Sequence, residues 1–240
     1  MADNTPTFHH LDNSQSQRIL WLLEELSIPY NLVSHLRNPP NSPHGVFLSP
    51  PSLRATGPYG KAPVLFTGAA DGHRYIPESS AIATYLIRTF DTSDKFGLKN
   101  GDWIRDEVLS SICSTSLGRA TSSMMMLDFG LIRNGDEARL GERAKRFDGP
   151  ELRSVLGDLE RELKEGPKGG YFMGEHPGRA DILLEFPLTS VRHRKYVDLK
   201  REFPALDAWL DRVYSREAWK SGIEKGNGYD MSVFPQRPRI

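Results

Sequence analysis

The sequence is very poor in cysteine, with Cys113 as its only one among 240 residues. One cysteine excludes an intramolecular disulfide, a CxxC redox motif and a paired-cysteine metal site. We therefore expect a chain that works in a reducing compartment, and the cytoplasm is the simplest choice.

The sequence also lacks an excess of charge and a long apolar run. It has 31 Lys and Arg against 31 Asp and Glu. Nucleic-acid-binding domains usually carry a clear basic excess, so no nucleic-acid partner is expected. No window of about 18 apolar residues occurs, which predicts no membrane span. The first residues lack the basic-then-apolar layout of a secretion signal. Peripheral attachment, for example to the endoplasmic reticulum, remains compatible with these features.

Common catalytic signatures are missing as well. The sequence contains neither the GxSxG of serine hydrolases nor the HExxH of zinc proteases. His9 and His10 are adjacent, and on a strand they would point to opposite faces, so they do not form a chelating pair. We expect no metal site.

The first 91 residues show the pattern of an α/β domain. Residues 7–11 and 31–36 read as strands on either side of a helix, whose apolar stripe falls at helical period: Ile19, Leu22, Leu23 and Leu26. After a loop rich in Pro and Asn, residues 60–66 and 74–76 read as strands, followed by a second amphipathic helix from about residue 79 to 90. The order β-α-β then β-β-α predicts a thioredoxin-like layer.

The rest of the chain reads as helical. The polar segment 91–102 is the expected domain boundary, and one long helix is expected over 103–129. Two further apolar stripes begin after Pro150 and Pro204. We thus predict an α/β thioredoxin-like N-terminal domain (1–91), an all-α C-terminal domain (102–225) and a tail (226–240).

Four segments resemble a known family: 11–26, 57–65, the Glu-Ser-Ser-Ala-Ile of 78–82, and the Ala-Asp-Ile of 180–182. They are similar, in the same order, to motifs of the glutathione transferase superfamily. The resemblance extends to its fungal serine-type branch, including a yeast endoplasmic-reticulum-associated transferase and transferases of gliotoxin-type biosynthesis. It implies a homodimer that uses glutathione as co-substrate and no metal.

The resemblance implies that the enzyme stabilises the glutathione thiolate. An unperturbed thiol titrates near pH 8.5, and the thiolate is the nucleophile. The N-terminus of the first helix favours an anion, and a hydroxyl can donate a hydrogen bond to the sulfur. Ser14 is the expected donor, Asn13 is its rival, and Ser16 is expected to cap the helix.

The same resemblance assigns the glutathione-binding residues. Pro63 corresponds to the family's cis-proline, which would expose the backbone of Ala62 to the cysteinyl part of glutathione. Lys61 would reach the tripeptide backbone or its glycine carboxylate. Glu78 would pair with the γ-glutamyl ammonium and Ser79 with the γ-glutamyl carboxylate.

Other positions are less determined. His44 and Arg54 are the candidates for a cation that holds the glycine carboxylate. Asp181 is expected to cap a helix and to be structural. The small hydrophobic electrophile is expected between the loop near Ser14 and the helix that carries methionines 124–126.

Several functions share this architecture. The leading hypothesis is conjugation of glutathione to an electrophilic carbon, in detoxification or in a fungal secondary-metabolite pathway that installs sulfur in diketopiperazines. Peroxidase activity would use the same thiolate. The alternative is a non-catalytic binding or regulatory module, because a fold alone does not establish chemistry.

Overall fold

The computed structural model describes residues 4–39, 41–43, 48–128 and 136–234. These residues form two compact units. The first contains the chain up to Asp94 together with Ser215–Asp230, and the second contains Lys95–Tyr214 and the residues from Met231 onward.

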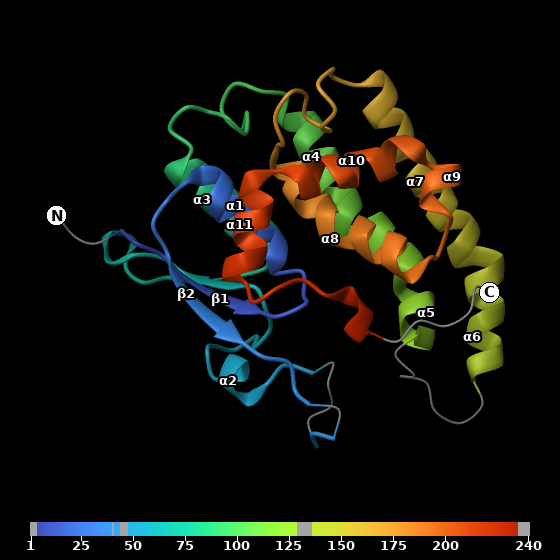
Figure 1. The fold of residues 1–240 in the computed structure, drawn as a ribbon, viewed down its shortest axis with the longest axis horizontal. Helices are drawn as coiled ribbons and strands as arrows, with labels where there is room; N and C mark the ends of the chain where they lie inside the picture. The colour runs from blue at the N-terminus through green and yellow to red at the C-terminus, as the bar shows by residue number, and fades with distance from the viewer. Residues whose placement is uncertain (1–3, 40, 44–47, 129–135, 235–240) are drawn as a thin grey trace. The chain divides into compact units, whose positions relative to one another are not determined.

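The first unit is built on a small mixed sheet (Figure 1). Its strands are β1 (Thr7–Leu11), β2 (Asn31–His35), β3 (Val64–Phe66) and β4 (Tyr75–Pro77), in the order β2-β1-β3-β4. β1 runs parallel to β2 and antiparallel to β3, and β4 is antiparallel to β3. Because parallel neighbours need a crossover connection, a helix links β1 to β2. The thioredoxin-like prediction is confirmed.

Two amphipathic helices bury their apolar stripes in this unit. α1 (Gln17–Leu26) buries five consecutive large side chains, Ile19 to Leu23. α3 (Ser79–Phe90) buries Ile82, Ala83, Leu86 and Ile87 and contacts α1. Short helical segments α2 (Pro51–Arg54) and η1 (Ala69–Asp71) lie in the connections. The stripes that predicted the two long helices are thus the faces that form the core.

A helix from the end of the chain completes this core. α11 (Glu217–Lys225) packs along α1 (Figure 1). Trp219 meets Trp21 edge to face, with ring centroids 5.9 Å apart. Lys225 Nζ donates to Glu24 at 2.7 Å. The sequence predicts a helical domain that extends to residue 225, but α11 belongs to the first unit. The reason is that Trp219 and Lys225 have their partners on α1.

The second unit is helical. Its helices are α4 (Trp103–Ile112), α5 (Gly118–Asp128), α6 (Glu137–Arg143), α7 (Gly149–Glu165), α8 (Arg179–Arg194), α9 (Leu199–Glu202) and α10 (Pro204–Ser215). π-helical turns η2 (Cys113–Leu117) and η3 (Ala144–Asp148) join α4 to α5 and α6 to α7, and a 3₁₀ turn η4 (Met231–Val233) follows later. The single long helix expected over 103–129 is therefore α4 and α5 joined through a π turn, and residue 129 lies outside the described residues.

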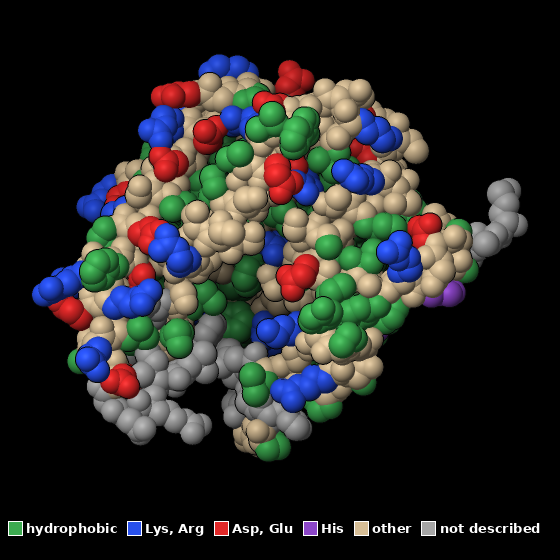
Figure 2. All heavy atoms as spheres, turned by 180° about the vertical axis from the view of Figure 1, so that it is seen from behind, with side chains coloured by type: hydrophobic (Ala, Val, Ile, Leu, Met, Phe, Trp, Pro, Cys, Tyr) green, Lys and Arg blue, Asp and Glu red, His purple; other side chains and the backbone are tan. Residues whose placement is uncertain are grey.

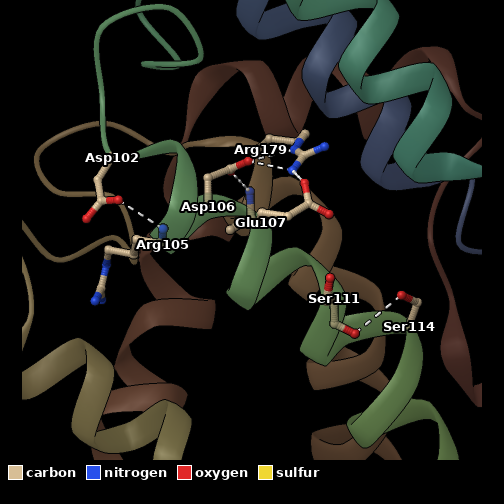
Figure 3. A network of polar contacts seen from close by, with 8 residues as sticks. Asp102, Arg105, Asp106, Glu107, Ser111, Ser114 and Arg179 are labelled. Carbon is tan, nitrogen blue, oxygen red and sulfur yellow. Dashed lines mark hydrogen bonds and ion pairs between the residues drawn. The ribbon is translucent and has the colours of Figure 1, made fainter.

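An ion-pair network joins the start of α4 to the start of α8 (Figure 3). Arg179 donates to Asp106 through Nε at 2.7 Å and to Glu107 through Nη2 at 2.6 Å. Asp106 also accepts from the Ala180 amide at 3.0 Å. Asp106 and Arg179 are buried, so the partnership offsets the cost of removing both charges from water.

Asp181 occupies the first turn of α8 and is completely buried. Its carboxylate accepts from the backbone amides of Phe172 and Gly178, both at 2.9 Å, and from Trp209 Nε1 at 2.8 Å. Gly178 has no side chain to return the bond. A Cβ atom there would lie 2.3 Å from Met173 Cγ, which explains why the usual Ser or Thr is absent. Asp181 is thus a structural acceptor, as its sequence context indicates.

The surface carries both signs of charge. In the face seen in Figure 2, Lys and Arg side chains are interspersed with Asp and Glu. Among the described residues, short-range ion pairs include that of Lys220 with Glu217. Within the residues that the structure describes, none of the helices combines the length and the apolar character needed to cross a bilayer.

We expect Asp181→Ala to lower the free energy of unfolding by about 3 kcal/mol, because three buried N–H donors lose their acceptor. Asp181→Asn keeps the size of the side chain and one acceptor oxygen but removes the ionisable group. Burial raises the pKa of Asp181 to about 6 from an ordinary value of 3.8. A raised acid pKa favours the folded state at low pH, so wild type should gain stability relative to Asp181→Asn as pH falls from about 6 to about 4.

Thermal denaturation of the three proteins across this pH range measures both effects. A difference between wild type and Asp181→Asn that does not change with pH would contradict the assigned environment of the carboxyl group.

Candidate functional site

The loop between β1 and α1 turns sharply at Asn13, whose φ of 48° lies in the left-handed region that asparagine tolerates better than most residues. Ser16 sits at the N-cap of α1, and its carbonyl accepts from the Ile19 amide at 3.0 Å. Its hydroxyl does not cap the helix but bonds elsewhere in the loop. The backbone therefore places residues 13–15 at the positive end of the α1 dipole.

Ser14 is buried, and its hydroxyl has partners inside the protein. Its Oγ lies 2.8 Å from the Leu11 carbonyl and 2.7 Å from Ser16 Oγ. It accepts from the Ser16 amide at 3.1 Å. The residue stands where the sequence analysis expects a sulfur donor, but its single proton is engaged in the loop.

Asn13, the rival donor, is held by the C-terminal segment. Its Oδ1 accepts from the backbone amide of Asp230 at 2.6 Å. Its own carbonyl accepts from Arg37 Nη2 at 3.0 Å. Within the part of the chain that the structure describes, no hydrogen bond is formed by Asn13 Nδ2, so this amide still has donors for a ligand.

The Ala62–Pro63 peptide bond is cis, which confirms the expectation drawn from the resemblance. It directly precedes β3, and Gly60 ahead of it adopts a φ of 53°. The Ala62 carbonyl accepts a long bond of 3.4 Å from Gln15 Nε2. Lys61 is exposed. This backbone corner lies in the same unit as the Asn13–Ser14 loop, and Gln15 connects the two.

Glu78 and Ser79 form the start of α3. Glu78 is exposed and has a φ of 68°, a conformation that few residues other than glycine adopt. Ser79 is only 5% exposed, and its Oγ has no hydrogen-bond partner among the described residues. The first amides of α3 have no partner within the helix, as at every helix start. An unsatisfied hydroxyl beside such amides fits a carboxylate.

The glycine-carboxylate partner stays unassigned. His44 lies outside the described residues. Arg54 is exposed and donates to the Ser49 carbonyl at 3.1 Å. The structure instead brings Arg37 to the loop, where burial lowers the pKa of its guanidinium. Sequence reasoning missed Arg37, although a cation just after a strand end was the available signal.

The sequence indicates only that His10 does not form a chelating pair with His9. In the structure His10 lies in the core beside the loop that precedes α1. It is completely buried. Its Nε2 lies 3.0 Å from the Gly226 carbonyl and its Nδ1 lies 2.8 Å from Ser16 Oγ. Burial, together with His35, lowers its pKa to about 4, so the ring is uncharged near neutral pH. His9 projects to the other side and contacts His35, with Nδ1 and Nε2 3.0 Å apart.

The methionines expected at the electrophile site lie on α5. Met124 lines a cavity of about 530 Å³ within the second unit, together with Leu127, Ala144 and Tyr196. Tyr196 donates to Asp128 at 2.6 Å on this wall. Across the described residues, no three His, Cys, Asp or Glu side chains come together in a way that could hold a metal ion.

The unsatisfied hydroxyl gives a stability prediction. Ser79→Ala removes no hydrogen bond in the protein without ligand, so we expect the free energy of unfolding to stay within about 0.5 kcal/mol of wild type or to rise. Ser16→Ala is the matched control, because its buried hydroxyl is bonded and its loss should cost about 1–3 kcal/mol. Thermal denaturation compares them; a large loss for Ser79→Ala would mean that the hydroxyl has a partner.

Comparison with known proteins agrees with this architecture. Residues 14–89 match the model of the glutathione S-transferase N-terminal domain, and residues 122–217 match that of the C-terminal domain. Glutathione S-transferase 3 of Schizosaccharomyces pombe is 39% identical, over 94% of this chain and 90% of that protein.

Solved structures show the same fold. A glutathione S-transferase from Actinobacillus pleuropneumoniae has a TM-score of 0.75 at 28% identity, over 96% of this chain and 97% of the other. Glutathione transferase URE2P8 from Phanerochaete chrysosporium, solved with oxidized glutathione, has a TM-score of 0.71 at 21% identity, over 94% and 96% of the two chains.

Proposed function

Because the chain belongs to the glutathione transferase family, we propose that it is an enzyme that binds glutathione, stabilises its thiolate and adds the sulfur to an electrophilic carbon. The observation that carries the proposal is the start of α3. There the buried hydroxyl of Ser79, beside a helix N-terminus, has no hydrogen-bond partner in the part of the chain that the structure describes. A buried polar group is normally satisfied, so this hydroxyl suits a ligand with a carboxylate.

The γ-glutamyl end of glutathione matches this position. Its carboxylate would accept from Ser79 Oγ and from the first amides of α3, where the helix dipole favours negative charge. Its ammonium would pair with the carboxylate of Glu78, which is exposed next to Ser79. A zwitterionic amino-acid group therefore fits better here than a simple anion would.

The middle of the tripeptide would lie along the cis-proline corner. The backbone of Ala62 would pair with the cysteinyl backbone in the manner of an added strand. The long bond from Gln15 Nε2 to the Ala62 carbonyl is weak enough to be replaced by a ligand amide. Lys61 is exposed nearby and would reach the glycine end.

The sulfur would then lie at the loop before α1. The helix dipole favours the thiolate over the thiol. Ser14 would donate from its hydroxyl, and Asn13 would donate from Nδ2, which the bond from Asp230 to Oδ1 leaves available. The thiol proton leaves to solvent. The thiolate electron pair then forms the carbon–sulfur bond, and the electrophile either loses its leaving group or takes up a proton.

For the second substrate we propose a small hydrophobic electrophile. Detoxification of varied electrophiles and sulfur installation in diketopiperazines of the gliotoxin type are both compatible with this chemistry. Turnover of a cyclic dipeptide-derived acyl-imine in strong preference to chlorodinitrobenzene would select the second. We further propose that the enzyme acts as a homodimer in the cytoplasm, where glutathione is kept reduced.

The alternative is a binding or regulatory module that holds glutathione without activating it. The two differ in one measurable property, the pKa of the bound thiol. Retention on glutathione-agarose together with an unshifted thiol pKa would favour the module.

We expect Ser79→Ala to weaken glutathione binding about tenfold or more, because a hydrogen bond to a charged carboxylate is lost. Isothermal titration calorimetry measures the dissociation constant. Ser80→Ala is the matched control, since its side chain is exposed one position along the same helix and should leave binding within about twofold. Equal affinities for the two variants would exclude the proposed carboxylate position.

We expect Ser14→Ala to lower the acid ionisation constant of the bound thiol about ten- to a hundredfold, since the thiolate loses a donor. Absorbance of the thiolate, followed against pH, measures this constant. Asn13→Ala is made in parallel. If only Asn13→Ala changes the ionisation, the donor is the asparagine amide and the role proposed for Ser14 is wrong.

A further inference from the structure

The hydrogen bonds around His10 fix where each proton lies. The Gly226 carbonyl can only accept, so the His10 Nε2 that faces it at 3.0 Å must carry a hydrogen. His10 is buried, no acidic side chain among the described residues raises its pKa, and the ring is neutral near pH 7. A neutral imidazole has one N–H, so Nδ1 is bare and accepts.

The same reasoning continues through the two serines. The contact of 2.8 Å between bare His10 Nδ1 and Ser16 Oγ needs a proton, and only the Ser16 hydroxyl can supply it. With that proton used, the contact of 2.7 Å between Ser16 Oγ and Ser14 Oγ needs the proton of Ser14. The Leu11 carbonyl, 2.8 Å from Ser14 Oγ, attracts the same proton.

The two hydroxyl protons of this hydrogen-bond series therefore point inward, that of Ser14 to Ser16 and that of Ser16 to His10. Ser14 Oγ already accepts from the Ser16 amide, so what it offers a ligand is its remaining lone pair. That lone pair can accept from the S–H of a thiol. To donate to a thiolate, Ser14 must turn its proton away from Ser16 and Leu11, and the cost of this turn weakens the stabilisation that Ser14 gives.

We propose that His10 is a positioning residue that, through Ser16, keeps the Ser14 hydroxyl proton turned into the protein and so limits how strongly Ser14 stabilises the glutathione thiolate. The inference rests on the proposed function. Without an acceptor at Nδ1, the Ser16 hydroxyl can turn its proton to Ser14 Oγ, 2.7 Å away. Ser14 is then released to donate to sulfur.

The charged surroundings do not alter this proton order. His35 is the titratable group that acts on His10 electrostatically, and it opposes protonation of His10. The pKa of His35 is itself lowered by burial. The Gly226 carbonyl favours the Nε2–H tautomer at any pH at which the ring is neutral.

The test compares two substitutions at His10. His10→Gln places an amide donor near the former Nε2 but leaves nothing at the position of Nδ1. His10→Asn is the matched control, because its amide oxygen can take the place of Nδ1. We expect His10→Gln to raise the acid ionisation constant of bound glutathione's thiol about three- to tenfold, the effect of one hydrogen bond. His10→Asn should stay within about twofold of wild type.

The direction of the effect separates positioning from a merely structural role, since general damage to the loop would lower the ionisation constant. The double variant His10→Gln/Ser14→Ala should match Ser14→Ala alone. An unchanged or lowered constant in His10→Gln, or a raised constant that survives in the double variant, overturns the proposal.

Nitrogen NMR of the His10 ring in the wild-type protein supplies a measurement that does not depend on any variant folding. We expect a protonated Nε2 and a bare Nδ1 at neutral pH, and a proton on Nδ1 overturns the proposal. If wild type shows neither glutathione binding nor a thiolate signal, the proposed function fails with it. Normal binding and ionisation without the His10→Gln effect would refute the positioning role alone.

Discussion

The packing of α11 against α1 is the contact on which the arrangement of the functional loop depends. The two helices meet through Trp21 and Trp219, and through Lys225 and Glu24. This contact fixes the chain that follows α11, which supplies the Gly226 carbonyl to His10 and the Asp230 amide to Asn13. A loop near the start of the sequence is thus held by residues about two hundred positions later.

Gly226, which caps the C-terminus of α11, allows this close approach. A Cβ atom at Gly226 would lie 2.7 Å from Leu20 Cδ1 and 2.9 Å from Gln17 Oε1. A side chain would therefore separate the Gly226 carbonyl from His10, because the backbone could not stay beside α1. The packing of the chain after α11 against α1 therefore depends on the missing side chain of Gly226 as well as on contacts between side chains.

Much of the fold could be predicted from the sequence. The apolar stripes of α1 and α3 predicted helices whose buried faces form the core. The position of α11 could not be predicted in this way, because an amphipathic pattern shows that a face is buried but not against what. The cis bond before Pro63 came from the resemblance, since sequence alone makes cis the rarer isomer. The partners of Ser14 and His10 depend on distances of a few tenths of an ångström, which no spacing rule contains.

The hydrogen bond between Asn13 and Asp230 joins residues that are far apart in the sequence, which has a consequence for the synthesis of the protein. A ribosome adds about 5–20 residues per second, so some 10 to 40 seconds separate the synthesis of the loop from that of the residues that hold it. During this interval the N-terminal half lacks the acceptor for His10 and the donor for Asn13. The site can be completed only after residues 226–230 have been synthesised, so a chain that terminates before them would carry the binding motifs without a finished loop.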